Sequence, residues 1–69
     1  MIWILTQDRE RIVACNDIMV NGDVVEEVDF DATLGVYTTE ERAREIQLEI
    51  WHCIKFDRTI HLYYEMPIA

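Results

Sequence analysis

Alternating hydrophobic and polar positions predict a series of short strands followed by one helix. The first strand is expected from Ile2 to Thr6, and the polar stretch Gln7 to Glu10 is typical of a turn. A second strand is expected from Arg11 to Val20, with a bend or bulge at Asn16-Asp17. Asn21-Gly22-Asp23 predicts a tight hairpin turn, because Asn and Gly both tolerate a positive φ.

The strand that returns from this hairpin is expected from Val24 to Phe30. Its alternation predicts one face made of Val24, Glu26, Val28 and Phe30. The other face is more acidic and is expected to be solvated; it consists of Val25, Glu27, Asp29 and Asp31. A short fourth strand is expected from Thr33 to Tyr37, in which Gly35 indicates a bulge or a close backbone approach.

The helix has the clearest pattern in the chain. Thr38 and Glu41 have the spacing of a capping box, and the helix is expected to end near Phe56. One helical face is hydrophobic and is expected to meet the core: Ala43, Ile46, Ile50, Cys53 and Ile54.

The chain after the helix predicts one more strand. Residues 57–59 are expected to form a loop, and alternation resumes from Ile60 to Met66 before Pro67 stops the strand. The predicted fold is α+β, an antiparallel meander of four to five strands with one helix, placed before the last strand, packed on a face. We expect residues 1–69 to form a single small domain.

Composition and charge narrow the possible partners. The chain is 51% hydrophobic and 29% charged, which is typical of a folded domain. Its net charge of -8 argues against a partner that is a long nucleic acid or an anionic membrane. The opening apolar run is too short for a signal peptide or a membrane span, which favours the cytoplasm.

The small size makes self-association the expected source of extra stability. Domains below about 70–80 residues commonly need disulfides, a metal or oligomerisation. Cys15 and Cys53 do not form a closely spaced pair, and the expected reducing compartment disfavours a disulfide.

Motifs for metal binding and catalysis are weak. Residues 29–40 resemble a calcium loop, but Leu34 stands where the sharp turn requires Gly. His52 and Cys53 are neighbours on the helix and diverge by about 100°, which disfavours a shared zinc ion. The chain has no serine, no glycine-rich phosphate loop and no signature around either cysteine. We therefore expect no metal, no cofactor and no catalytic residues, in a protein that is not an enzyme.

The basic and aromatic residues are the best candidates for ligand binding. Of the six basic residues only Lys55 is not an arginine, and arginine favours bidentate recognition of phosphate. The candidate ligand-binding residues are Trp3, Arg9, Arg11, Arg42, Arg44, Trp51, Tyr63 and Tyr64. A simpler interpretation pairs Arg44 with Glu40 or Glu41, and Arg42 with Glu45, on the helix surface, and leaves the aromatic side chains to the core.

A second apolar patch on the helix predicts an oligomer interface. Leu48 and Trp51 lie off the main hydrophobic stripe, and His52 lies beside them. The alternative is that Trp51 covers the rim of a small core.

Three segments carry a resemblance to a known family: Met1–Gln7, Leu34–Ala43 and Tyr64–Pro67. Together they resemble a family of small proteins encoded by phages and prophages of low-GC Gram-positive bacteria. The resemblance brings no catalytic motif. It implies an accessory role, and small phage accessory proteins often act against bacterial defence. Some self-associate and sequester nucleotide signals, and others block defence proteins directly as acidic mimics of nucleic acid.

The resemblance, the arginines and the helix patch together predict a function. We expect a non-enzymatic phage protein, in the cytoplasm of the infected bacterium, that self-associates and binds a small anionic ligand such as a cyclic nucleotide or an ADP-ribose derivative. The alternative is a protein–protein inhibitor of a host defence protein that uses an acidic surface: Glu26, Glu27, Asp29, Asp31, Glu45 and Glu49. A structural or regulatory phage factor without a small ligand is the third possibility.

Overall fold

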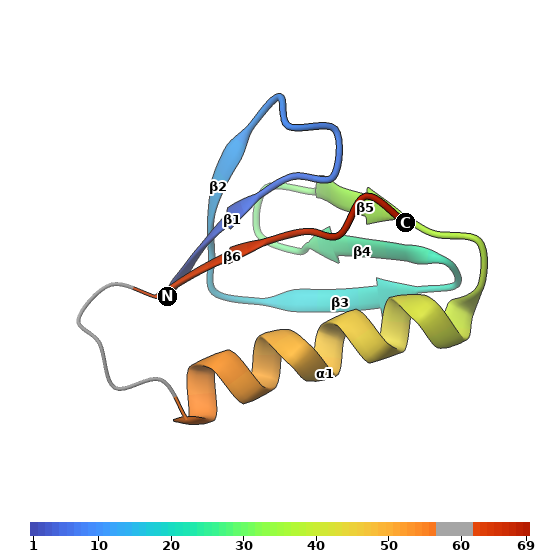
Figure 1. Ribbon diagram of the computed structural model, residues 1–69. Coiled ribbons are helices and arrows are strands. Elements are labelled where there is room, and N and C mark those ends of the chain that lie inside the picture. The colour runs from blue at the N-terminus through green and yellow to red at the C-terminus, as the bar shows by residue number, and fades with distance from the viewer. Residues whose placement is uncertain (57–61) are drawn as a thin grey trace.

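The computed structural model describes residues 1–56 and 62–69, and its class is α+β as predicted. The strands form two three-stranded sheets rather than one, with the orders β2-β1-β6 and β3-β4-β5 (Figure 1). The elements are β1 (Ile2–Leu5), β2 (Ile12–Cys15), β3 (Ile18–Asn21), β4 (Val24–Glu27), β5 (Ala32–Val36), α1 (Glu40–Phe56) and β6 (Tyr63–Glu65).

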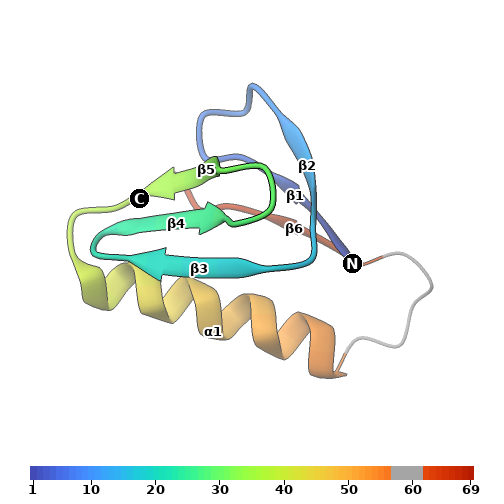
Figure 2. The same cartoon turned by 180° about the vertical axis from the view of Figure 1, so that it is seen from behind.

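The bend expected at Asn16-Asp17 is confirmed, and it explains why there are two sheets. It divides one long apolar stretch into β2, which pairs antiparallel with β1, and β3, which pairs antiparallel with β4. The hairpin between β3 and β4 is also confirmed, but its two-residue turn is Gly22-Asp23: Gly22 has a positive φ of 61°, whereas Asn21 pairs with Val24 as the last residue of β3 and has no positive φ. The chain therefore passes from one sheet to the other at the bend (Figure 2).

The last strand corrects the prediction of a purely antiparallel meander. β6 pairs parallel with β1, from Trp3 opposite Tyr63 to Leu5 opposite Glu65. The long helix carries the chain back along the molecule, so β6 starts at the end where β1 also starts, as a crossover connection requires (Figure 1). The expected beginning of this strand at Ile60 lies outside the described residues.

β4 is shorter than predicted, and the face expected to be solvated is buried at Val25 and Glu27, whereas Asp29 and Asp31, beyond the strand, are exposed. The strand ends at Glu27, whose carboxylate accepts hydrogen bonds from the backbone N–H of Asp29 at 3.0 Å and of Phe30 at 2.7 Å. These bonds turn the chain, and Asp31 takes a positive φ of 54°. Val25 and Glu27 are both buried, with Glu27 0% exposed. Alternation alone misplaced this face because the helix and the other sheet cover it.

Gly35 combines both features that its position predicted. The register between β4 and β5 shifts there, from Val25 opposite Gly35 to Glu26 opposite Thr33. A Cβ atom on Gly35 would lie 2.7 Å from the ring of Tyr37. A bulge and a close approach therefore coincide at this residue.

The helix begins one residue later than the predicted capping box requires. Thr39, not Thr38, is the N-cap, since its Oγ1 accepts a hydrogen bond from the backbone N–H of Arg42 at 3.1 Å. Glu41 is then the second helical residue and Arg42 the third. A capping box requires Glu or Gln at the third position, so the prediction of a capping box is wrong.

The hydrophobic stripe of the helix is confirmed over its first half and changes over its second. Ala43, Ile46 and Ile50 are buried in the core. Cys53 is half-buried, and Ile54 is 40% exposed. Cys53 therefore still packs against the core, and only Ile54 leaves it.

The core lies where the two sheets and the helix meet. Its buried hydrophobic side chains form one cluster: Ile2, Ile4, Val13 and Cys15 from the first sheet, Val25, Ala32 and Leu34 from the second, Ala43, Ile46 and Ile50 from the helix, with Tyr37 and Met66. α1 runs back along β3 in both views (Figures 1 and 2). Within the two described ranges, no helix is long and apolar enough to cross a membrane.

Candidate functional site

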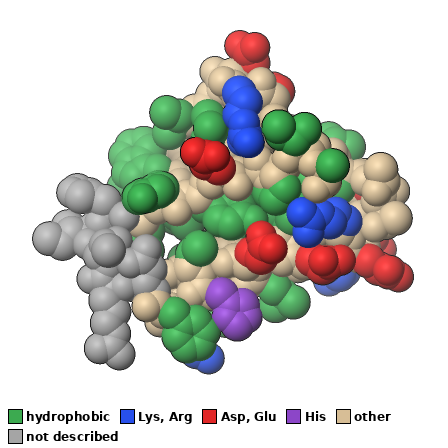
Figure 3. Space-filling view, in the orientation of Figure 1, with side chains coloured by type: hydrophobic (Ala, Val, Ile, Leu, Met, Phe, Trp, Pro, Cys, Tyr) green, Lys and Arg blue, Asp and Glu red, His purple; other side chains and the backbone are tan. Residues whose placement is uncertain are grey.

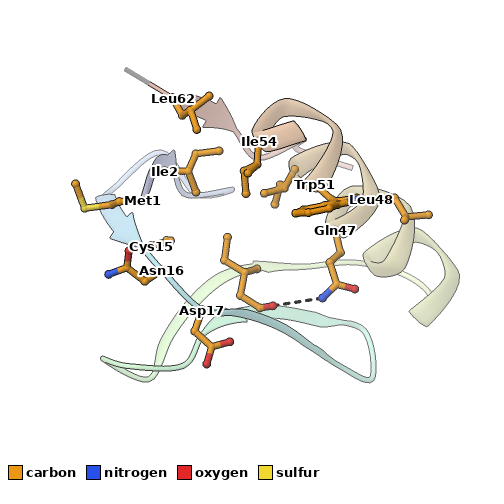
Figure 4. A pocket seen from close by; sticks show the side chains of 12 residues that line it. Met1, Ile2, Cys15, Asn16, Asp17, Gln47, Leu48, Trp51, Ile54 and Leu62 are labelled. Carbon is orange, nitrogen blue, oxygen red and sulfur yellow. Dashed lines mark hydrogen bonds between the residues drawn. The ribbon is translucent and has the colours of Figure 1, made fainter. Parts of the chain in front are cut away.

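A groove of about 600 Å³ opens between the second half of α1 and the bend that joins β2 to β3 (Figure 4). Its walls are mainly apolar: Ile2, Ile18, Leu48, Trp51, Ile54 and Leu62. Trp51 is 54% exposed and presents part of its ring to the groove. Such a groove accepts a planar or apolar body of the size of a base or nucleoside.

The polar groups of the groove come mostly from the bend. Asn16 and Asp17 line it, together with Gln47, whose Nε2 donates a hydrogen bond to the carbonyl of Ile18 at 3.3 Å (Figure 4). Among the described residues that line it there is no Lys or Arg. The groove therefore has surface for a ring but no cation for a phosphate.

Cys15 also lines the groove, and its thiol is unreactive at neutral pH. Burial, with a smaller effect from the Glu27 carboxylate, raises its pKa to about 11. A protonated, buried thiol is a poor nucleophile. Cys53 is free as well, and neither cysteine forms a disulfide.

Sequence reasoning found Leu48 and Trp51 but missed the rest of this groove. The other walls come from the N-terminus and from the bend, which are far from the helix in the sequence. The predicted bend at Asn16-Asp17 was the one available signal, since a break in a strand often lies beside a site.

Two of the candidate arginines, Arg9 and Arg42, hold the chain after β6 instead of lying beside the groove. The main-chain oxygens of residues 66–69 each accept a hydrogen bond from a different side chain. Arg9 donates to Met66 at 2.8 Å, and Arg42 donates through Nε to Ala69 at 3.3 Å. Between them the Tyr37 hydroxyl donates to residue 67 and the Gln7 amide to residue 68, each at 2.8 Å.

The helix-surface ion pairs expected from spacing are confirmed. Arg44 pairs with Glu40 at 2.8 Å, and Arg42 pairs with Glu45 at 3.6 Å. Arg44 and Glu40 are both more than half exposed, so their pair contributes only a few tenths of a kcal/mol, about 0.3–0.5. The side chain of Arg11 is exposed and makes no hydrogen bond or ion pair within the described chain.

The structure does not gather the predicted arginines and aromatic side chains around one point. Arg42 and Trp51 are nine residues apart, which places them about 13 Å apart along the helix axis and on opposite faces. Arg44 lies on the same face as Trp51, about 10 Å along the axis from it. One protomer therefore brings the Trp51 ring and most of these guanidinium groups to different places.

The aromatic residues of the first sheet point in two directions. Trp3 and Tyr63 are neighbours in register, and they lie on the outer face, 44% and 74% exposed. Tyr64 points to the inner face, where its hydroxyl hydrogen-bonds the Glu49 carboxylate. Burial, followed by that carboxylate, raises the pKa of Tyr64. Tyr64 therefore joins β6 to the helix, and it is not among the groove residues.

The residues expected at an oligomer interface are also divided. Leu48 and Trp51 line the groove together. His52 does not; its ring stacks on Phe56 with 5.5 Å between the ring centroids. The exposed apolar surface of the helix thus has two sides, of which only one belongs to the groove.

The proposed acidic surface is smaller than the sequence suggests. Glu27 is buried and Glu49 is bonded to Tyr64, whereas Asp29, Asp31 and Glu45 are exposed. Acidic side chains lie along α1 on the face that Figure 3 shows, with hydrophobic side chains over the strands above them. Nowhere in the described ranges do three or more His, Cys, Asp or Glu side chains gather as a metal site requires.

Comparison with known proteins found no matching family model, no matching curated protein and no matching solved structure.

Proposed function

We propose that the protein is a non-enzymatic accessory protein of the phage-encoded kind that its sequence resembles. In this proposal it self-associates in the cytoplasm of an infected bacterium and sequesters a small anionic ligand of nucleotide type, which counters a defence signal. The observation that carries the proposal is the groove of about 600 Å³ with the exposed ring of Trp51 in its wall.

The chemistry of the groove suits the base of such a ligand. Stacking of a base on an aromatic side chain contributes about 1–3 kcal/mol. The amide groups of Asn16 and Gln47 lie in the same groove and can hydrogen-bond to the edge of a base. The part of the ligand that this groove serves is therefore the ring.

The phosphate groups require cations that the groove of one protomer lacks. Arg11 has no side-chain partner in the described chain, and Arg44 has only an exposed pair with Glu40. Such a weak pair is easily exchanged for a phosphate, to which arginine binds more strongly. In the proposal a second copy brings an arginine to the groove, and this is why self-association and ligand binding belong together.

Isothermal titration against cyclic nucleotides and ADP-ribose derivatives tests the proposal. We expect one class of these nucleotides to bind. Trp51→Ala should raise its dissociation constant at least about tenfold, because the stacking contact with the base is lost. Phe56→Ala is the matched control, because Phe56 is an exposed aromatic residue of the same helix that does not line the groove. An absence of binding across the whole panel would refute the proposal.

A second candidate is a protein–protein inhibitor with an acidic contact surface. The observation in its favour is the turn after β4, where Asp29, Phe30 and Asp31 are exposed and Glu27 holds the backbone. Replacing Asp29 and Asp31 by Lys distinguishes the two functions. It should abolish protection of a phage on a defence-carrying host if the acidic surface acts, and leave nucleotide binding unchanged if the groove acts.

A further inference from the structure

The outer edge of β2 offers unpaired main-chain groups. β2 is the edge strand of its sheet and pairs only with β1. The carbonyl of Arg11 accepts a hydrogen bond from Thr6, so the main chain of Arg11 faces β1. Because the direction alternates along an antiparallel strand, Val13 and Cys15 also face β1, while Ile12 and Ala14 face outward. Their N–H and C=O groups have no partner in the described part of the chain.

This edge lacks the devices that usually prevent strand pairing. Natural edge strands carry charged residues or Pro, or are covered by another element. β2 has the sequence Ile-Val-Ala-Cys, without a charge or a Pro. By contrast, the outer edge of β5 is covered by Gln7, whose N–H donates to Leu34 at 2.9 Å and whose Oε1 accepts from Val36 at 2.7 Å. β2 is thus an edge that remains open to another strand.

The residues that flank β2 carry opposite charges. Arg11 precedes the strand and Asp17 follows its bend, and both are exposed. Neither side chain makes a hydrogen bond or ion pair with another described residue. In a chain with a net charge of -8, an uncharged strand with a cation at one end and an anion at the other lets a second copy approach without like charges facing one another.

We propose that β2 pairs antiparallel with β2 of a second copy, about a two-fold axis at Ala14. Hydrogen-bonded registers pair the outward-facing residues Ile12 and Ala14 with one another or with Asn16, the residue that follows the strand. Among these registers, the one centred on Ala14 sets Arg11 of each copy opposite Asp17 of the other. The interface is isologous and forms two ion pairs. The β2-β1-β6 sheets of the two copies then form one continuous six-stranded sheet.

This arrangement would bring a cation to each groove. Asp17 lines the groove, and Arg11 of the second copy lies opposite Asp17 in the pairing. The lining of each groove thereby gains a guanidinium group, which is paired with Asp17 until a phosphate of the ligand displaces that carboxylate. This consequence for ligand binding rests on the proposed function, whereas the pairing of the strands does not.

Sedimentation velocity of the full chain with Ala14→Pro tests the pairing. Proline removes the outward N–H at the centre of the pairing but no N–H that β1 uses, so the monomer should keep its fold. We expect a wild-type dimer and a dissociation constant raised at least about tenfold by Ala14→Pro. Ala14→Thr is the matched control, because it keeps the N–H and should still dimerise. A wild type that stays monomeric up to about 1 mM, or a dimer that Ala14→Pro leaves intact, overturns the proposal.

Exchanging the flanking charges tests the register without a Pro. Arg11→Asp and Asp17→Arg should each weaken the dimer at least about tenfold, since each sets like charges opposite one another twice. The double variant should restore wild-type affinity, and a failure to restore it contradicts the register. A dimer that Trp51→Ala removes and Ala14→Pro leaves would place the interface on the helix instead. If the protein dimerises through β2 as proposed but binds no nucleotide, the proposed function is refuted and the pairing of the strands is not.

Discussion

Glu27 shows how one buried carboxylate can end a strand. Its side chain is fully buried and has no salt-bridge partner among the described residues. Its two oxygens instead accept the N–H groups of Asp29 and Phe30. Hydrogen bonds to a charged acceptor are stronger than neutral ones, and they offset part of the cost of burying the carboxylate.

Removal of this carboxylate should destabilise the protein. Glu27→Ala leaves two N–H groups without an acceptor and a cavity beside the core, so we expect a loss of about 2–4 kcal/mol in the free energy of unfolding. Glu26→Ala, on the solvent-facing side of the same strand, should change it by less than about 0.5 kcal/mol. Urea denaturation measures both. Equal losses in the two variants would contradict the structural role of Glu27.

Cys15 should make stability depend on pH in the alkaline range. Burial raises the pKa of its thiol from 9.0 to about 11, so the folded protein holds this proton more tightly than the unfolded chain. The resulting stabilisation is complete below pH 9 and is lost as the pH rises through 11.

Cys15→Ala should remove this part of the pH dependence. The difference in unfolding free energy between wild type and variant should shrink between pH 9 and 11, by up to about 2–3 kcal/mol. Urea denaturation at several pH values measures it. Cys53→Ala is the control, and a difference between wild type and Cys15→Ala that stays constant with pH would contradict the prediction.

The start of the helix depends on which of two adjacent threonines caps it. Thr38 and Thr39 are chemically the same, and the spacing to Glu41 favoured Thr38. In the structure the chain that leaves β5 is fixed by Tyr37, which packs in the core and bonds the carbonyl of Pro67. This contact sets where helical geometry can begin, and it makes Thr39 the cap.

Two single substitutions distinguish the caps. Thr39→Ala should lower the free energy of unfolding by about 1 kcal/mol, because the N–H of Arg42 loses its acceptor. Thr38→Ala should have an effect of less than about 0.5 kcal/mol. Thermal or urea denaturation of both variants measures the difference. A larger loss in Thr38→Ala would contradict the cap at Thr39 and support a capping box of Thr38 and Glu41.

Strands and helix were predictable from the sequence, but their partners were not. The sequence pattern located the described strands to within a few residues, although it predicted β2 and β3 as one bent strand, because side chains of a strand alternate whatever the strand pairs with. The parallel pairing of β6 with β1, and the division into two sheets, depend on how the helix and the bend return the chain. Those are contacts between distant residues, which local patterns do not contain.

Gln7 connects three parts of the fold that are far apart in the sequence. Its main-chain N–H and its Oε1 bond the edge of β5, and its Nε2 bonds the carbonyl of Ile68. Arg9, Tyr37 and Arg42 hold the neighbouring carbonyls of the same segment. The contacts between the turn after β1, the second sheet and the chain after β6 therefore depend on side chains rather than on a strand ladder.

Substitution of Gln7 should loosen these connections in a graded way. Gln7→Ala removes two side-chain hydrogen bonds and should lower the free energy of unfolding by about 1–2 kcal/mol. Gln7→Glu keeps an acceptor for the N–H of Val36 and loses only the donor to Ile68, so its effect should be smaller. Hydrogen exchange at the Val36 amide should quicken in Gln7→Ala and stay slow in Gln7→Glu. Unchanged exchange in both would contradict this function of Gln7.

The candidate site, too, was predictable only where it depends on local sequence pattern. The sequence pointed to Trp51 and Leu48 because their positions on a helical wheel follow from the chain alone. It grouped Arg9, Arg11, Arg42 and Arg44 with them by chemistry, whereas the fold uses Arg9 and Arg42 to hold residues 66–69.

The amino-acid sequence was thus sufficient for the α+β class, the helix and the first part of its buried stripe, the hairpin at Gly22 and the surface ion pairs of the helix, since each depends on neighbours within a few residues. The burial of Glu27, the parallel β6, the cap at Thr39 and the groove beside Trp51 depended on the fold. Each of them arises where segments distant in the chain meet, and the free energy of such contacts is set by packing rather than by local pattern.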